Sequence, residues 1–138
     1  MKANELMIGD WVYNKHHKRN IQITPYDFFT HGHLPTGRQY FVGEPELVSG
    51  RNLEPILLTT EILEKIGFVK YIAWQYVLPE MEGEILVSIM PMNGLPNADN
   101  KWLVAIKNGY TDVKIPITYI HELQHALKLC GVKKEIKL

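Results

Sequence analysis

The chain has 138 residues, of which 46% are hydrophobic and 22% are charged, a composition typical of soluble globular proteins. Fifteen Lys and Arg balance fifteen Asp and Glu, which argues against a general nucleic-acid binder or a polybasic membrane-surface protein. A single cysteine, Cys130, excludes an internal disulfide framework, and no stretch approaches the ~20 apolar residues of a membrane span. Since the first residues lack the apolar core of a signal peptide, we expect a cytoplasmic protein.

The first 55 residues predict a small β-rich lobe built from short strands and turns. A turn at Ile8–Asp10 precedes a strand that begins at Trp11–Tyr13, and Ile21–Thr24 alternates like a half-buried strand. Residues 30–38 contain two glycines and a proline, which predicts a loop, and Gln39–Val42 predicts another strand.

The first helix is predicted to begin near Thr59, because threonine is a favourable N-cap residue. Glu61 would complement the helix dipole in the first turn, and Leu58 and Leu63 occupy the two positions of a hydrophobic staple. Gly67 is expected to end this helix after about two turns.

An antiparallel sheet of three to four strands is predicted after this helix. The expected strands are Phe68–Leu78, Glu84–Met90, Lys101–Lys107 and Tyr110–Ile115, with a hairpin signal at Asn108–Gly109 between the last two. A second helix is expected to begin with Pro116, where a missing N–H costs nothing, and to run to Cys130 before Gly131. The predicted fold class is therefore α+β: one domain, with a β-rich lobe over residues 1–55 and a helix–sheet–helix lobe over residues 56–138.

The second helix carries a motif with catalytic chemistry, His121-Glu122-Leu123-Gln124-His125, which resembles the zincin motif H-E-x-x-H. Because residues four apart lie on one face of a helix, both histidines could bind one zinc ion, with Glu122 as the general base on a zinc-bound water. A catalytic zinc needs a third protein ligand, and Glu135 is the one acidic residue that follows the motif. A zinc-dependent hydrolase is thus the alternative function.

A helical wheel favours a structural interpretation of the same helix. Its apolar arc predicts the core face and contains Ile120, Leu123, Leu127 and Cys130. His121 and His125 lie roughly opposite this arc, on a polar stripe that is expected to face mostly solvent. Lys128 shares the stripe and would place a cation beside a bound zinc ion. Cys130 is expected to be buried and unreactive.

Two further groups of residues suggest other binding functions. His31 and His33 could form a metal site, alone or with the two histidines of the helix, although histidines in a loop are more often solvated. Lys15–Arg19 is a basic run of the kind that contacts phosphate. Its place between two strands favours a solvated hairpin tip, and the neutral net charge does not favour binding to nucleic acid.

Four aromatic residues of the predicted sheet have two alternative roles. Tyr71, Trp74, Tyr76 and Trp102 could fill the core or form an interaction surface. Because Phe68–Leu78 is apolar on both faces, both faces are expected to be covered. The N-terminal lobe or a second copy could supply the cover, and we favour a homodimer built on the sheet aromatics.

Three segments of the chain are informative together: Met1–Leu6 running into Ile8–Val12, Pro55–Thr59 running into Gly67–Phe68, and Tyr119–Gln124. In this order they resemble a family of small proteins encoded by Bacteroidetes genomes and their phages or prophages, which has no assigned activity. Members of that family often carry asparagine where this chain has His125, which implies that the complete H-E-x-x-H is coincidental. The resemblance, the neutral charge and the incomplete catalytic set predict a non-enzymatic accessory or interaction protein without a cofactor.

Overall fold

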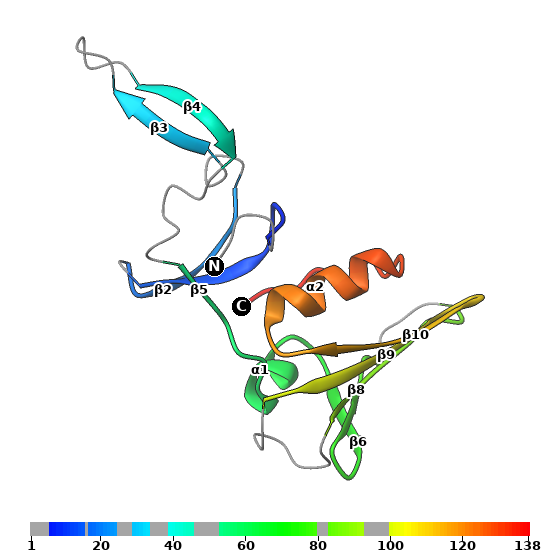
Figure 1. Cartoon of the computed structure of the whole chain (residues 1–138). Helices are drawn as coiled ribbons and strands as arrows, with labels where there is room; N and C mark the ends of the chain where they lie inside the picture. The colour runs from blue at the N-terminus through cyan, green and yellow to red at the C-terminus, as the bar shows by residue number, and fades with distance from the viewer. Residues whose placement is uncertain are drawn as a thin grey trace. The chain divides into compact units, whose positions relative to one another are not determined.

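The computed structural model describes residues 6–15, 17–24, 29–33, 39–45, 53–79, 83–92 and 100–138 (Figure 1). The chain forms two compact units, Met1–Ile56 and Leu57–Leu138, and each is described by itself. In the part of the chain that the structure describes, the secondary structure is mostly antiparallel strands with two helices, which confirms the predicted α+β class. Over the described residues, every helix is too short or too polar to cross a membrane.

The N-terminal unit contains two groups of antiparallel strands. β1 (Trp11–Asn14) lies between β2 (Arg19–Gln22) and β5 (Leu53–Pro55). The side chains of Leu6, Val12, Ile23 and Leu53 form the apolar core beside this sheet. The predicted turn at Ile8–Asp10 is confirmed, and the Asp10 carboxylate closes it by accepting a hydrogen bond of 2.7 Å from the Met7 N–H.

The second group is a hairpin of β3 (Phe29–His33) and β4 (Gln39–Pro45). β4 confirms the strand predicted at Gln39–Val42, whereas the loop predicted over residues 30–38 is wrong at residues 30–33. In β3, Gly32 pairs with Tyr40 across the ladder, so strand pairing overrides the preference of glycine for loops. Residues 34–38 lie outside the described residues.

A five-stranded antiparallel sheet is the centre of the C-terminal unit, in the order β10-β9-β8-β7-β6. Its strands are β6 (Val69–Ile72), β7 (Gln75–Val77), β8 (Leu86–Pro91), β9 (Trp102–Asn108) and β10 (Thr111–Ile117). The single strand predicted over Phe68–Leu78 is wrong, because the chain reverses at Ala73–Trp74 and forms two strands. Ala73 adopts φ +43° in this turn, where no Gly, Pro, Asn or Asp announces a reversal.

The hairpin predicted at Asn108–Gly109 is confirmed. Asn108 pairs with Thr111, so the connection between β9 and β10 has two residues, and Gly109 supplies the positive φ of +61° that such turns require. The side chain of Asn108 also donates a 2.7 Å hydrogen bond from Nδ2 to the carbonyl of Cys130. This bond ties the hairpin to the end of the second helix.

Both helices begin and end with recognisable local interactions. In α1 (Thr60–Lys65), Oγ1 of the predicted N-cap Thr59 accepts a hydrogen bond from the Ile62 N–H at 3.3 Å. α2 (Ile120–Leu129) starts later than predicted, because Pro116 belongs to β10. β10 is an edge strand, where the missing N–H of proline costs no ladder hydrogen bond.

The glycines predicted to end the two helices, Gly67 and Gly131, are confirmed. At the end of α1, Gly67 N–H donates to Glu64 and Phe68 N–H to Leu63; Gly131 and Val132 make the equivalent bonds after α2. This pair of bonds is the Schellman motif, in which glycine adopts the left-handed backbone.

The core of this unit lies between the helices and one face of the sheet. Buried side chains on that face alternate along the strands and include Val87, Ile89, Trp102, Val104 and Ile106. Trp102 packs edge-on against Tyr76, with ring centroids 6.4 Å apart, and donates a 3.0 Å hydrogen bond from Nε1 to the Leu58 carbonyl. Burial raises the pKa of the Tyr76 hydroxyl above its ordinary value, and the nearby carboxylates of Glu64 and Glu61 raise it further.

Replacing Gly131 with Ala is expected to lower the free energy of unfolding more than replacing Gly83. Both glycines have a positive φ, +73° and +70°, so each alanine carries the left-handed backbone cost of about 1–2 kcal/mol. A Cβ at Gly131 would also lie 3.2 Å from Nδ2 of Asn108 and disturb its bond to Cys130, a further loss of about 1 kcal/mol, whereas a Cβ at Gly83 meets nothing within 4 Å. Urea denaturation compares the two variants, and equal losses would contradict this role of Asn108.

Candidate functional site

The two histidines of the H-E-x-x-H motif lie next to each other on α2. The ring centroids of His121 and His125 are 5.7 Å apart and the rings meet edge to face. His121 also stacks on Tyr119, with centroids 5.7 Å apart and an angle of 8° between the planes. The motif thus forms a short aromatic stack at the start of the helix.

The expectation that both histidines face mostly solvent is wrong for His121, whose side chain is only 5% exposed. A helical wheel counts histidine as polar, whereas the ring of His121 packs as an aromatic surface against Tyr119. His125, one turn further along, is half-buried. The predicted core face is confirmed, because Ile120, Leu123, Leu127 and Cys130 are all buried.

Glu122 has a structural role that the zinc mechanism does not include. Its Oε1 accepts hydrogen bonds from the backbone N–H groups of Thr118 and Tyr119, at 3.1 and 3.0 Å. These are N–H groups at the start of a helix, which lack intrahelical acceptors, and a carboxylate there also complements the helix dipole. Glu122 is therefore a capping residue of α2.

Among the residues that the structure describes, no third zinc ligand lies beside the motif. Within the described ranges, no group of three or more His, Cys, Asp and Glu is close enough to hold a metal ion. Glu135 lies in the C-terminal segment with its side chain 74% exposed, where it approaches Lys137. His31 and His33 lie in β3 of the N-terminal unit.

The basic run forms the tip of the β1–β2 hairpin, as predicted. Lys15, His17, Lys18 and Arg19 are exposed, and His16 lies outside the described residues. Lys15 forms an ion pair of 2.9 Å with Glu54 of β5. One charge of the run is thus matched within the sheet, which reduces its capacity to bind phosphate.

Two of the four aromatic residues take the predicted core role, and the other two are exposed. Tyr76 and Trp102 are buried, whereas Tyr71 and Trp74 are 68% and 40% exposed. Nζ of Lys70 lies 4.5 Å from the ring centroid of Trp74, a cation–π contact at the surface. The turn at Ala73–Trp74 produces this division, because it separates the exposed strand β6 from β7.

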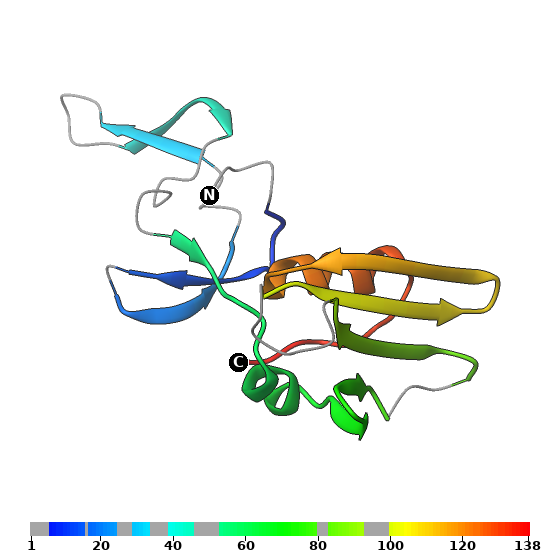
Figure 2. The same cartoon turned by 60° about the horizontal axis from the view of Figure 1, so that its bottom comes forward.

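The sheet has a second face, which we call the outer face. It carries the residues that alternate with the buried ones: Leu86, Ser88 and Met90 of β8, and Leu103, Ala105 and Lys107 of β9. In Figure 2, α2 lies behind β9 and β10, and no helix stands in front of β8, β9 or β10. Within the described part of this unit, the outer face therefore has no helix over it.

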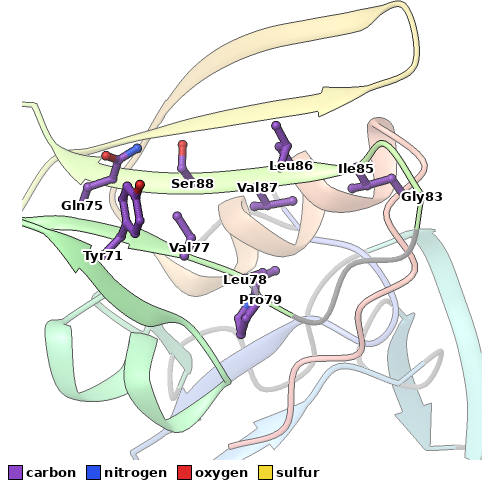
Figure 3. A pocket seen from close by; sticks show the side chains of 10 residues that line it. All are labelled: Tyr71, Gln75, Val77, Leu78, Pro79, Gly83, Ile85, Leu86, Val87 and Ser88. Atoms are coloured by element: carbon purple, nitrogen blue, oxygen red, sulfur yellow. The ribbon is translucent and has the colours of Figure 1, made fainter.

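The outer face contains two hollows that share Gln75. The larger hollow has a volume of about 550 Å³ and is lined by residues that include Tyr71, Val77, Leu86 and Ser88. Figure 3 shows Leu86 and Ser88 projecting to the same side of β8, with Tyr71 beside Gln75. The smaller hollow, of about 240 Å³, lies among Ile72, Trp74, Met90 and Pro91.

The sequence offered little sign of these hollows. Pairing of β6 with β7 skips Tyr71, since Lys70 pairs with Tyr76 and Ile72 with Gln75, which makes a β-bulge at Tyr71. No residue type in the sequence indicates the bulge at Tyr71 or the turn at Ala73. Ser88, a polar residue between the apolar Val87 and Ile89, is a weak sign in the sequence that one face of this strand is exposed.

Comparisons with protein-family models, with curated proteins and with solved structures found no match for the chain. What the protein does is therefore inferred from its own residues.

Replacing Glu122 with Ala is expected to lower the free energy of unfolding by about 1 kcal/mol, because two N–H groups at the helix start lose their acceptor. Glu122→Gln keeps an oxygen acceptor and should retain most of the stability. Glu135→Ala is the control, since that exposed side chain should contribute less than about 0.5 kcal/mol. Urea denaturation measures all three, and a loss in Glu122→Ala no larger than the control would contradict the capping role.

Proposed function

We propose that this chain is a non-enzymatic accessory or interaction protein of bacterial or phage origin that binds a protein partner through the outer face of its C-terminal sheet. The observation that carries the proposal is a set of large apolar side chains exposed at the β6–β8 side of the sheet. They are Val69, Tyr71, Ile72, Trp74, Leu86 and Met90. The resemblance of three sequence segments to a family from Bacteroidetes and their phages supports the origin.

The composition of this surface supports a protein partner. Aromatic residues and Met are enriched in protein interfaces, and Trp and Tyr are common among residues that dominate binding energy. Trp74 and Tyr71 have both an apolar ring and a polar group, so they can be wet in the free protein and buried in a complex. The strand register also supports the proximity of these side chains. Ile72 of β6 pairs with Gln75 of β7, and the next residue of β7, Tyr76, pairs with Ile89 of β8, so β7 lies between β6 and β8.

The homodimer predicted from the sheet aromatics is one form that this interaction can take. Tyr71 and Trp74 are the exposed members of that aromatic set. A second copy related by a twofold axis would place the same surface on both sides of the interface. Light scattering at tens of micromolar distinguishes a mass of one chain from a mass of two.

Site-specific photo-crosslinking in host cells tests the proposed surface. A photoreactive amino acid at Tyr71 or Leu86 is expected to give one discrete crosslinked product, whose partner mass spectrometry identifies. Tyr110 is the matched control, because it is fully exposed at the tip of the β9–β10 hairpin, away from the hollows. Substitution of Met90 by Glu should remove the product, since a charge would have to be desolvated in the interface. Equal crosslinking from Tyr110, or turnover of a substrate that is lost on a single polar substitution, would overturn the proposal.

A zinc-dependent hydrolase is the second candidate function, and the neighbouring rings of His121 and His125 favour it. The capping role of Glu122 opposes it, because the same carboxylate would have to leave two N–H groups to act as a base. The groups available on the described residues are two imidazoles, one fewer than the protein ligands of a catalytic zinc.

Zinc titration separates the two candidates. A tight zinc site must raise the free energy of unfolding, by about 2.7 kcal/mol at a zinc concentration 100 times the Kd. We expect zinc to leave the free energy of unfolding unchanged in the parent protein, in His125→Ala and in His17→Ala. His17→Ala is the control, because His17 is an exposed hairpin residue. Stoichiometric zinc binding that His125→Ala removes and His17→Ala retains would establish the metal site.

A further inference from the structure

We infer that the two hollows form one groove for an extended, uncharged segment of the partner protein, which places alternate apolar side chains in the hollows. This inference rests on the proposed function and specifies the chemistry of the partner. It starts from the shared residue, Gln75, which lines both hollows.

The lining chemistry selects against a charged ligand. Every described residue that lines either hollow is uncharged. A charged side chain that entered would lose hydration against these uncharged lining residues. Lys70, over the Trp74 ring, and Lys107, opposite Leu86, lie near the hollows but do not line them. Burial of one large apolar side chain contributes about 1.5–3 kcal/mol, so two such side chains would dominate the affinity.

The order of the hollows along β8 fits an extended chain. Leu86 and Ser88 line the larger hollow and Met90 lines the smaller one, so the hollows follow each other along the outer face of β8. Alternate residues of a strand are about 6.4–6.8 Å apart, and β8 and an extended peptide share this repeat. A helix repeats its side chains at a different spacing, so an extended segment matches the groove better.

Polar groups on the groove can hold the backbone of such a segment. Tyr71, Gln75 and Ser88 carry a hydroxyl, an amide and a hydroxyl at the larger hollow (Figure 3). The amide of Gln75 can both donate and accept, which is what a peptide backbone between two apolar side chains requires. When a peptide adds to a sheet edge, main-chain hydrogen bonds hold it and pockets take alternate side chains; on this sheet face the three polar side chains would take the place of those main-chain bonds.

Two local irregularities shape the rim of the groove. The bulge directs Tyr71 to the larger hollow, and the turn with Ala73 at φ +43° brings Trp74 to the smaller one. A left-handed backbone at alanine costs about 1–2 kcal/mol, which a glycine there would avoid. Both irregularities therefore place aromatic side chains at the hollows rather than among the buried core residues.

The test is an NMR titration of the full chain with a capped peptide, acetyl-Gly-Leu-Thr-Phe-Ser-Gly-amide, whose Leu and Phe are two residues apart. Saturable shifts are expected for the backbone amides of Gln75, Val77 and Ser88. A second peptide with Glu and Lys in place of Leu and Phe should bind at least about tenfold more weakly, since two apolar burials are lost. Equal binding of both peptides, or no saturable shift, would overturn the inference.

A matched pair of variants locates the binding. Ser88→Trp fills the larger hollow from a half-buried position and should remove the shifts, whereas Thr111→Trp adds the same ring on exposed β10 and should retain them. The dispersion of the amide spectrum checks that each variant is folded. Unchanged binding in folded Ser88→Trp would overturn the assignment to this groove.

The outcomes distinguish this inference from the proposed function. If Tyr71 gives a crosslinked partner but neither peptide binds, the extended segment is overturned and the interaction surface stands. If neither Tyr71 nor Leu86 gives a crosslinked product in the otherwise unsubstituted chain, the proposed function is overturned as well. If light scattering gives a mass of two chains and Ser88→Trp lowers it to one, the occupant is a second copy and the extended segment is overturned.

Discussion

The short segment before α1 is the constraint on which the C-terminal unit depends. The carbonyl of Leu58 accepts the indole N–H of Trp102, and the N–H of Leu58 donates to the carbonyl of Thr118. One residue thereby links α1, the start of β9 and the entry to α2. Its side chain is fully buried, and so is that of Trp102, so both the backbone and the side chains hold the helices to the inner face of the sheet. Loss of this link would leave a buried carbonyl without its donor, which is costly in an apolar interior.

Because both helices are held at one face, the outer face is left for another role. The alternation of β8 and β9 sends one set of side chains into the core and the other outward. Outer positions hold Leu86 and Met90 where a purely solvated face would hold polar residues, and β6 with the turn after it adds Tyr71 and Trp74. The apolar surface and its uncharged hollows are the physical basis for the proposed partner.

The H-E-x-x-H motif shows how a local sequence pattern can serve helix structure. Glu122 stands at the third position of α2, where a carboxylate can accept the first N–H groups, and His121 stacks on the residue that precedes the helix. The spacing that would suit a zinc ion also suits a helix start, since both follow from the helical repeat. A site of metal chemistry would further require a ligand from another element.

The sequence by itself determined the features that depend on neighbours in the chain. The N-cap at Thr59, the stops at Gly67 and Gly131 and the turn at Gly109 each follow from a few adjacent residues, and the apolar arc of α2 follows from the helical repeat. Tertiary structure decided the rest. Pro116 lies in an edge strand because β9 pairs with it, and the chain reverses at Ala73 without a turn residue. Of the sheet aromatics, Tyr76 and Trp102 are buried, whereas Tyr71 and Trp74 are exposed. Burial and strand pairing depend on residues far apart in the chain, and therefore a local pattern cannot specify them.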